Sequence, residues 1–529
     1  MNPEATENSG QNQRLALLLA MAMFVFVIDT SLMNVSISAV VRDLDTTVSG
    51  VQSAVAIEAL VSAAFILIGS KLGDLFGRKR AYVVGLLMYI SGAFAMLFAQ
   101  SLAPVILFWA VIGGLGASLY LPAMQSLIHG NFQGTAQAKA YALVGASAAI
   151  AAAIGPLLGG FLTTYLSWRV GFGLEAVVIV AVLLGSRRLL RDVPYTGERS
   201  MDGIGSALSV LGMGGLVLGI LAWQEGGESV GALMAVGLLA MVGLVYWLLR
   251  RVRENKPALL DPHLFKSKRF SFGISQGILQ QIALGGMLIA LPIYLQMVLD
   301  YNAMEAGLTL APLSLTMFGV AVLAGKRAGR RRPASLIRAG FALLLAAVGA
   351  LIPIIPEADS GWSLAVPLIL AGAGFGLLVS QLNNYTLSPV SEERAGEAAG
   401  INSATGSFGL SLGLAFAGAI MLAALSIAFT EKAESSTVLA PAEQQRVADA
   451  LEDDAQVMSN ARLEELLADQ PADVREEIVS INTDARPLAL QAALLVPLLA
   501  ALIGLLSSFR MMRLPDPAPS PTGEAAAVA

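Results

Sequence analysis

The chain has 529 residues, of which 56% are hydrophobic and only 13% are charged. Soluble proteins carry about 25% charged residues, so this chain has too little charge to cover a water-exposed surface. The net charge of −5, the absence of cysteine and the presence of only two histidines exclude a basic nucleic-acid-binding face, thiolate metal sites and histidine-based catalysis. The composition predicts a membrane protein.

Long apolar stretches follow one another along the chain. A helix needs about 20 apolar residues to cross the hydrocarbon core, and fourteen stretches meet that requirement. The sequence therefore predicts an all-α polytopic membrane protein. The predicted spans are residues 15–41, 49–70, 81–99, 104–127, 138–166, 170–190, 203–223, 230–249, 271–299, 304–324, 335–355, 362–387, 397–428 and 488–508.

The basic residues predict the orientation. An even number of spans places both termini on one side of the membrane, and all but seven of the 33 Lys and Arg residues fall in the loops and tails on that side. Short cytoplasmic loops are enriched in Lys and Arg. We therefore expect both termini to be cytoplasmic.

Three acidic residues lie well inside predicted spans: Asp29 in the first, Glu58 in the second and Glu175 in the sixth. Charge inside a bilayer is costly and is a functional hypothesis by default. No Lys or Arg in the first five spans is placed to neutralise these acids, so each could bind a proton and a cation in alternation. The alternative is that helix–helix hydrogen bonds, or water near the outer surface, satisfy the carboxyl groups.

A short charged turn separates the second and third spans. Its sequence, Ser70-Lys71-Leu72-Gly73-Asp74-Leu75-Phe76-Gly77-Arg78-Lys79-Arg80, combines an acid, flexible glycines and bases. Asp74 could cap a neighbouring helix, where the helix dipole favours an anion, and Arg78 and Lys79 could pair with acids on other helices. We expect Asp74, Gly77, Arg78 and Lys79 to form a cytoplasmic gate.

Glycine and proline gather in the fifth span as Gly155-Pro156-Leu157-Leu158-Gly159-Gly160. Proline removes a backbone donor and kinks a helix, whereas glycine permits close helix packing. The alternative is the ordinary use of these residues in membrane helices.

Amides and hydroxyls, rather than acids, mark the spans of the second half. A weak repeat between the halves, Gly114-Leu115-Gly116 and Gly374-Phe375-Gly376, favours a duplicated fold with a substrate site between its halves. We expect polar residues from both halves to line that cavity: Asn34, Gln276, Gln280, Tyr294, Asn383 and Asn384.

One large loop, residues 431–486, falls outside the membrane in this topology. It is acidic, and apolar residues recur at helical spacing in pairs such as Val447 with Leu451 and Val474 with Ile478. The spacing predicts two or three short amphipathic helices. The loop could act as an external cap or cation-gathering collar, or it could be a solvated hairpin without a transport role.

Together these motifs resemble the major facilitator superfamily, and specifically its fourteen-span drug:proton antiporter branch. The matching segments are the turn at 70–80, Asp29-Thr30 with Asn34-Val35, the Gly155-Pro156 motif, Ser167-Trp168-Arg169 and Leu291-Pro292-Ile293-Tyr294-Leu295-Gln296. The resemblance implies a cytoplasmic tail (1–14), an N-terminal six-helix bundle (15–190), two inserted helices (203–249), a C-terminal six-helix bundle (271–508) that includes the outer loop 431–486, and a disordered cytoplasmic tail (509–529).

The sequence also departs from the family pattern. Ala110 stands where an arginine linked to proton transfer is usual, Glu58 replaces an aromatic residue and Glu175 replaces an asparagine. One base is lost and two acids are gained, which favours a cationic cargo and places the coupling chemistry on Asp29, Glu58 and Glu175.

The resemblance implies a proton-coupled exporter of small amphipathic or cationic compounds that works by alternating access. We expect no enzymatic activity, no cofactor or metal, the proton gradient as energy source, and a monomer in a cell membrane that binds no nucleic acid. The alternative is an exporter or facilitator of one specific metabolite or lipid that is not coupled to protons.

Overall fold

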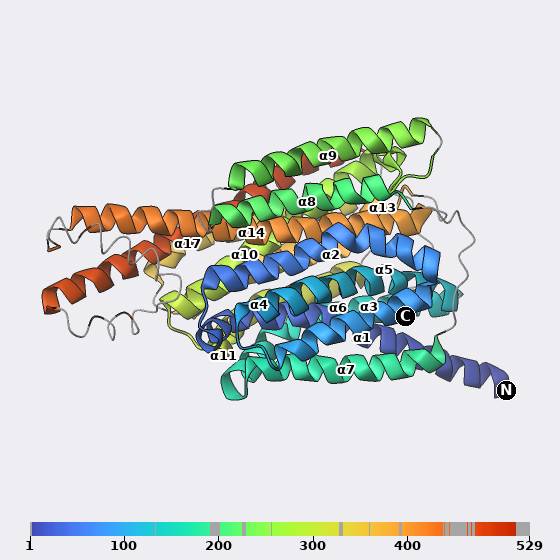
Figure 1. Ribbon diagram of the computed structural model, residues 1–529, viewed down its shortest axis with the longest axis horizontal. Helices are drawn as coiled ribbons and strands as arrows, with labels where there is room; N and C mark the ends of the chain where they lie inside the picture. Colours follow the sequence, from blue (N-terminus) through green and yellow to red (C-terminus); the bar gives the residue numbers. More distant parts are fainter. Residues whose placement is uncertain are drawn as a thin grey trace.

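The fold is known from a computed structural model, and every regular element that it describes is a helix (Figure 1). The structure describes residues 3–132, 134–190, 201–224, 229–254, 256–326, 332–358, 360–390, 394–436, 438, 439, 444, 463, 467 and 471–514.

The first half of the chain forms one group of helices. They are α1 (Pro3–Leu44), α2 (Val48–Phe76), α3 (Arg78–Met96), the short α4 (Leu102–Pro104), the π-helix η1 (Val105–Gly113), α5 (Gly114–Asn131), α6 (Gly134–Tyr165) and α7 (Trp168–Leu189). Local signals set the breaks between them. Thr47 caps α2 by accepting a hydrogen bond from the Gly50 amide at 3.0 Å. Gly77 separates α2 from α3 with a φ of 102°, a backbone angle that glycine adopts without strain.

Two further helices, α8 (Gly203–Gln224) and α9 (Val230–Arg253), pack on each other before the second group begins. Buried Asp202 anchors this pair: its carboxylate accepts hydrogen bonds from the Gly205 amide at 2.9 Å and the Trp247 indole at 2.9 Å. The same carboxylate also accepts the Leu259 amide at 3.2 Å. One side chain therefore joins α8, α9 and the connection that follows them.

The second group contains the remaining helices. They are η2 (Pro262–Lys266), α10 (Lys268–Ile293), the π-helix η3 (Tyr294–Val298), α11 (Ala303–Lys326), α12 (Pro333–Ile354), η4 (Ile355–Glu357), η5 (Gly361–Leu364), α13 (Ala365–Leu387), α14 (Ala395–Ser435) and α17 (Ala472–Met511). The two groups meet where α2 packs on α14 and α6 packs on α11. The Ser411 hydroxyl of α14 donates to the Ala56 carbonyl of α2 at 2.8 Å, which is a direct bond between the halves.

The predicted spans agree with the helices. Among the described residues, thirteen helices are long and apolar enough to cross a membrane. The predicted span 81–99 corresponds to α3, which is not among the thirteen and starts with three basic residues that lower its hydropathy. The prediction of a single helix over 104–127 misses a change of winding, because this stretch is divided into α4, η1 and α5.

The prediction for residues 431–486 is partly wrong. Helix α14 continues to Ser435 and α17 begins at Ala472, so both ends of the predicted loop belong to long helices. Hydropathy detects the apolar part of a helix and misses its polar extension beyond the bilayer. Val474 and Ile478 lie in α17, whereas Val447, Leu451 and most of the centre of the loop, like the tail beyond residue 514, lie outside the described residues.

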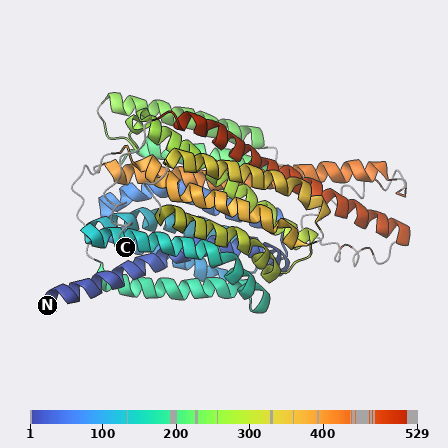
Figure 2. The same cartoon turned by 180° about the vertical axis from the view of Figure 1, so that it is seen from behind.

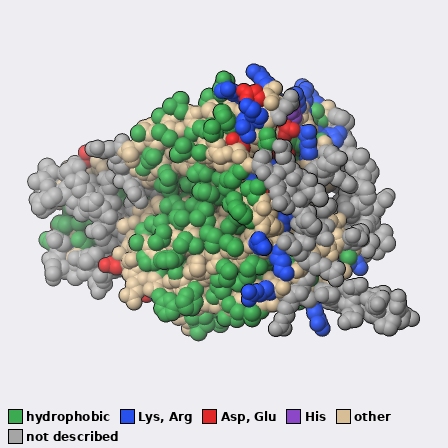
Figure 3. Space-filling model, turned by 45° about the vertical axis from the view of Figure 1, so that its right-hand side comes forward, with side chains coloured by type: hydrophobic (Ala, Val, Ile, Leu, Met, Phe, Trp, Pro, Cys, Tyr) green, Lys and Arg blue, Asp and Glu red, His purple; other side chains and the backbone are tan. Residues whose placement is uncertain are grey.

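The two long helices project together from one end of the molecule, opposite the end at which α1 begins (Figures 1 and 2). Lys432 of α14 pairs with Asp484 of α17 at 3.0 Å in this extension. Figure 3 shows an apolar band around the middle of the molecule, with Lys and Arg side chains gathered toward the end at which α1 begins. This distribution matches a protein that crosses a bilayer.

Close backbone contacts fix how the helices pack. A Cβ atom added to Gly372 of α13 would lie 2.2 Å from the Leu313 carbonyl oxygen of α11, whereas one added to Gly349 of α12 would meet nothing within 4 Å. Overpacking a tight contact costs about 1–3 kcal/mol. We therefore expect Gly372→Val to lower the thermal unfolding temperature of the purified protein and Gly349→Val to leave it nearly unchanged. Equal unfolding temperatures for the two variants would contradict the tight α11–α13 contact.

Candidate functional site

Asp29 is buried in the middle of the N-terminal half, with 3% of its surface exposed. The Tyr89 hydroxyl of α3 donates a hydrogen bond to its carboxylate, and the Trp109 indole of η1 donates to both of its oxygens at 2.9 and 3.1 Å. Both donors are neutral, so they satisfy the carboxylate without neutralising its charge. Asp29 therefore joins three elements, α1, α3 and η1, through one acid.

The other two predicted acids lie within electrostatic range of Asp29. Glu58 of α2 and Glu175 of α7 are buried, and Asp29 is close enough to both to repel them electrostatically. Neither carboxylate oxygen of Glu175 has a hydrogen-bond partner among the described residues. Tyr120 of α5 lies within electrostatic range of all three acids and packs edge-on against Tyr89. The three acids form one cluster, which we call the acid cluster.

Sequence analysis did not identify Tyr89, Trp109 or Tyr120. An aromatic residue in an apolar helix is normally part of the core, so nothing in the sequence separates these three from the other aromatic residues. The sequence also does not indicate the π-helical winding of η1. Residues 105–112 are all apolar and include no glycine or proline that would signal a π-helix.

The predicted gate residues lie together at the turn between α2 and α3. Arg78 pairs with Asp74 across Gly77 at 3.2 Å, so the two residues stabilise their own turn. Lys79 donates to the carbonyl oxygens of Leu190 at 2.6 Å and Arg187 at 3.3 Å, at the end of α7. A cation at a helix C-terminus also interacts favourably with the helix dipole. Lys79 therefore links the turn to the C-terminal end of α7.

The glycine–proline motif of α6 contacts both halves of the molecule. Gly155 and Gly159 pack against Ser31 and Leu32 of α1, where an added Cβ would lie 2.4 and 3.0 Å from the nearest atom of each residue. Gly160 faces α11, where an added Cβ would lie 2.4 Å from the Ala303 carbonyl oxygen. Pro156 belongs to the same seam, since a Cβ on Gly307 of α11 would lie 2.3 Å from its carbonyl oxygen. These small residues allow the halves to touch.

Two of the six residues predicted to line a substrate cavity take part in helix packing. Gln276 is fully buried and donates to the Gly504 carbonyl at 3.2 Å and to Ser507, so it joins α10 to α17. The Tyr294 hydroxyl donates to the carbonyls of Ile355 at 3.1 Å and Ala358 at 3.3 Å. Both side chains serve helix packing, because a buried polar group must find a partner.

The other four of these residues differ in exposure. Gln280 is buried in α10 and Asn34 in α1, where the Asn34 amide donates to the Thr30 carbonyl at 2.7 Å. Asn383 and Asn384 are exposed near the end of α13, and the Asn402 amide of α14 donates to Asn383 at 3.3 Å. Of the six predicted residues, only these two asparagines are exposed.

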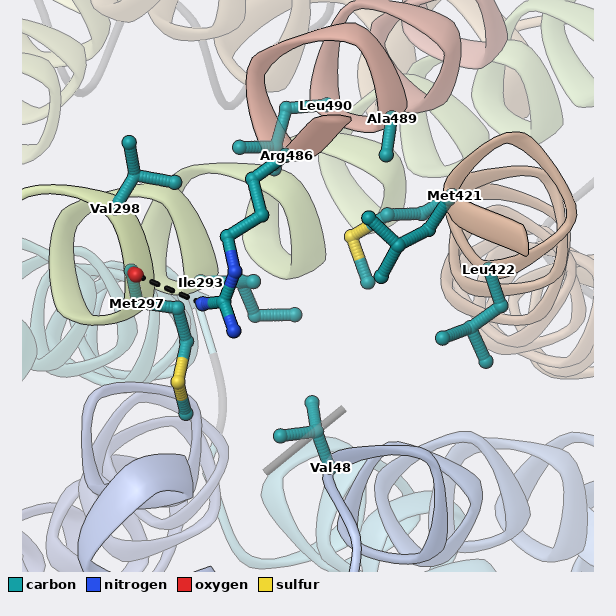
Figure 4. Close-up of a pocket in the computed structure, with 10 residues that line it drawn as sticks. Val48, Ile293, Met297, Val298, Met421, Leu422, Arg486, Ala489 and Leu490 are labelled. Atoms are coloured by element: carbon teal, nitrogen blue, oxygen red, sulfur yellow. Dashed lines mark hydrogen bonds between the residues drawn. The ribbon is translucent and has the colours of Figure 1, made fainter. Parts of the chain in front are cut away.

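A separate cavity lies near the end of the bundle from which the α14–α17 hairpin projects (Figure 4). The space is about 400 Å³, which includes the part that is open to the outside. Arg486 of α17 is its one charged lining residue and donates to the Met297 carbonyl at 2.8 Å. Val48 of α2 closes the cavity from the other half. The cavity therefore bridges the seam between the halves, away from the acid cluster.

The acids of the cluster should differ in their effect on stability. Asp29→Leu would leave the Tyr89 and Trp109 donors buried without a partner, at about 1–3 kcal/mol for each group. Glu175→Leu would instead remove a buried carboxyl group that has no hydrogen bond. We expect Asp29→Leu to lower, and Glu175→Leu to raise, the thermal unfolding temperature in detergent. A lower unfolding temperature for Glu175→Leu would contradict this account of Glu175.

Comparison with known proteins agrees with the fold. The sequence pattern of the Major Facilitator Superfamily matches residues 19–414. The chain is 30% identical to a puromycin resistance protein of Streptomyces alboniger, over 76% of this chain and 80% of the relative. It is 28% identical to a probable actinorhodin transporter of Streptomyces coelicolor, over 75% of this chain and 70% of the relative. It is also 28% identical to the multidrug resistance protein Stp of Mycobacterium tuberculosis, over 77% and 75% of the two chains.

A solved structure supports the same fold. The crystal structure of a bacterial homologue of the human lysosomal transporter Spinster matches with a TM-score of 0.64 and 14% identity, over 97% of this chain and 99% of that one. The part of the chain that the structure describes is helical and holds thirteen candidate spans, and the family match covers most of the sequence, so the protein is a multi-pass membrane transporter and not an enzyme. It belongs to the Major Facilitator Superfamily.

Proposed function

We propose that this transporter exports small amphipathic or cationic compounds in exchange for protons, by alternating access. The observation that carries the proposal is the acid cluster, in which three carboxyl groups are buried together and Asp29 is bonded only to neutral donors among the described residues. The names of relatives, which include multidrug and puromycin resistance proteins, support a small-molecule drug as cargo.

The chemistry of exchange follows from burial. A carboxylate removed from water needs a positive partner, and a proton and an organic cation compete for that role. When one binds, the other is displaced. A proton that enters down a membrane potential of 100 mV contributes about 2.3 kcal/mol, so the proton gradient can drive export without a cofactor.

The proposed orientation of the chain in the membrane determines which side each gate faces. We propose that both termini face the cytoplasm, because Lys and Arg gather at the end of the molecule where α1 begins (Figure 3). The turn that holds Asp74 and Arg78 then lies on the cytoplasmic side, and the Gly160–Ala303 and Gly307–Pro156 contacts close the outer side. We expect a monomer to contain the whole transport path.

A dedicated transporter is the second candidate. Several relatives are named for one compound each, among them methylenomycin A and riboflavin. Ala110, fully buried beside Trp109, provides no base near Asp29 for proton transfer. Both observations favour an exporter of one metabolite or lipid that moves without protons.

Proteoliposomes can separate the two functions. The purified protein is reconstituted with a trapped pH-sensitive dye, a proton gradient is imposed, and tetraphenylphosphonium or a neutral amphiphile is added. We expect the cation to release protons through the wild-type protein. We expect Asp29→Asn to abolish uphill transport, and Glu58→Gln to reduce proton release at least tenfold, because each removes a site at which the proton and the cation compete.

The matched control is Asp484→Asn, which removes an exposed acid from the α14–α17 extension. This variant should transport like the wild type. Cation export that continues unchanged in Asp29→Asn would refute the role of the acid cluster. Transport of a neutral compound without proton movement would favour the dedicated transporter.

A further inference from the structure

The π-helix η1 is wound differently from the helices around it. Its nine residues, Val105–Gly113, form hydrogen bonds that span one residue more than those of an α-helix. π-Helical stretches are rare and are found mostly as single turns at functional sites. The apolar sequence of η1 gives no local reason for this winding, so contacts with other helices must hold it.

Trp109 supplies those contacts. Its indole N–H reaches both oxygens of Asp29, and its ring packs edge-on against Phe172 of α7 at 6.3 Å between centroids. The neighbouring Phe108 carbonyl presses against α3, where an added Cβ on Gly92 would lie 2.7 Å from its oxygen. The hydrogen bonds among these contacts depend entirely on Asp29.

The segment after η1 is locked to two other helices. Gly114 faces the backbone of α2, with an added Cβ 3.0 Å from the Glu58 carbonyl oxygen. Gly116 faces α3, with an added Cβ 2.6 Å from the Gly85 carbonyl oxygen. Helix α5 therefore cannot turn by itself, and a change in the winding of η1 must move α2, α3 and α5 as one unit against α1.

We infer that Trp109 couples the state of Asp29 to the winding of η1: an Asp29 carboxylate holds η1 as a π-helix, and a proton or cation on Asp29 releases it to α-helical winding. This inference rests on the proposed function for the identity of the ligands. A hydrogen bond to a charged carboxylate is roughly twice as strong as one to a neutral group, so neutralising Asp29 weakens the bond to Trp109. One residue of register corresponds to about 100° of rotation and 1.5 Å of rise.

The groups that surround Asp29 show which residues can take part in this coupling. The titratable groups that face it are Glu58 of α2, Tyr89 of α3, Tyr120 of α5 and Glu175 of α7. Among the described residues, none of these four side chains forms a hydrogen bond with η1, whereas Trp109 belongs to it. Trp109 is therefore the positioning residue of the cluster, and α2 and α3 carry its movement to the Asp74–Arg78 turn.

The movement can be measured as a distance, because the natural chain has no cysteine to compete for labels. Spin labels are attached to Gln125→Cys, exposed on α5, and Leu184→Cys, exposed on α7. Distances are measured by double electron–electron resonance in lipid nanodiscs, at mildly alkaline and mildly acidic pH and with tetraphenylphosphonium. We expect acid or the cation to shift the wild-type distance by several ångströms.

Trp109→Phe keeps an aromatic ring but removes the N–H donor, so this variant should show, at both pH values, the distance that the wild type shows at acidic pH. The matched control is Trp168→Phe: Trp168 also donates to an aspartate of α1, Asp43, at 2.9 Å and also packs on Phe172, but it lies outside the acid cluster. The control should shift with pH like the wild type. A Trp109→Phe protein that follows pH as the wild type does would overturn the inference.

A second variant covers the case in which Trp109→Phe does not fold. Asp29→Asn mimics the neutral acid and should also show the acid distance at both pH values; the wild-type alkaline distance in this variant would overturn the inference. Proton release from proteoliposomes is recorded with the same proteins. Wild-type protein that moves no protons but still changes distance would refute the proposed exchange and leave the coupling through Trp109 intact.

Discussion

The hydrogen bonds from Tyr89 and Trp109 to the Asp29 carboxylate are the interaction on which the N-terminal half depends. Each donor comes from a different element, so the acid joins α1 to α3 and η1 in a region from which water is excluded. Because the donors are neutral, they fix the position of the carboxylate and leave its charge to be balanced by something else. Under the proposed function, a stable fold and a site for a mobile cation are combined in this one side chain.

The two halves use their buried polar groups differently. In the second half, the Gln276 amide nitrogen and the Tyr294 hydroxyl donate to carbonyl groups and complete helix contacts, while the Gln276 amide oxygen has no hydrogen-bond partner among the described residues. In the first half, Glu175 has no hydrogen-bond partner among the described residues. A group left in that state destabilises the protein, and the proposed binding of a proton or cation by the acid cluster gives a reason for this cost. The three acids of the cluster all lie in the first half, whereas the second half buries neutral amides such as Gln276 and Gln296.

Small residues determine how the helices can move against one another. Gly160 and Gly307 bring α6 and α11 into backbone contact across the seam, while Gly114 and Gly116 hold α5 against α2 and α3. Packed helices of this kind shift between discrete arrangements instead of deforming continuously. Transport by rocking of two halves requires that behaviour, and the membership of the chain in the Major Facilitator Superfamily is consistent with it.

The sequence by itself determined the membrane-spanning helices and the three buried acids, because hydrophobicity and misplaced charge are properties of local composition. It also located the turn at Asp74 through residues that act on their own neighbours. It did not reveal the π-helix, the polar extensions of α14 and α17, or the roles of Tyr89 and Trp109. Only the tertiary structure decided these, since an indole becomes a hydrogen-bond donor to Asp29, and an amide such as Gln276 becomes a link between helices, only when a distant segment brings its partner within reach.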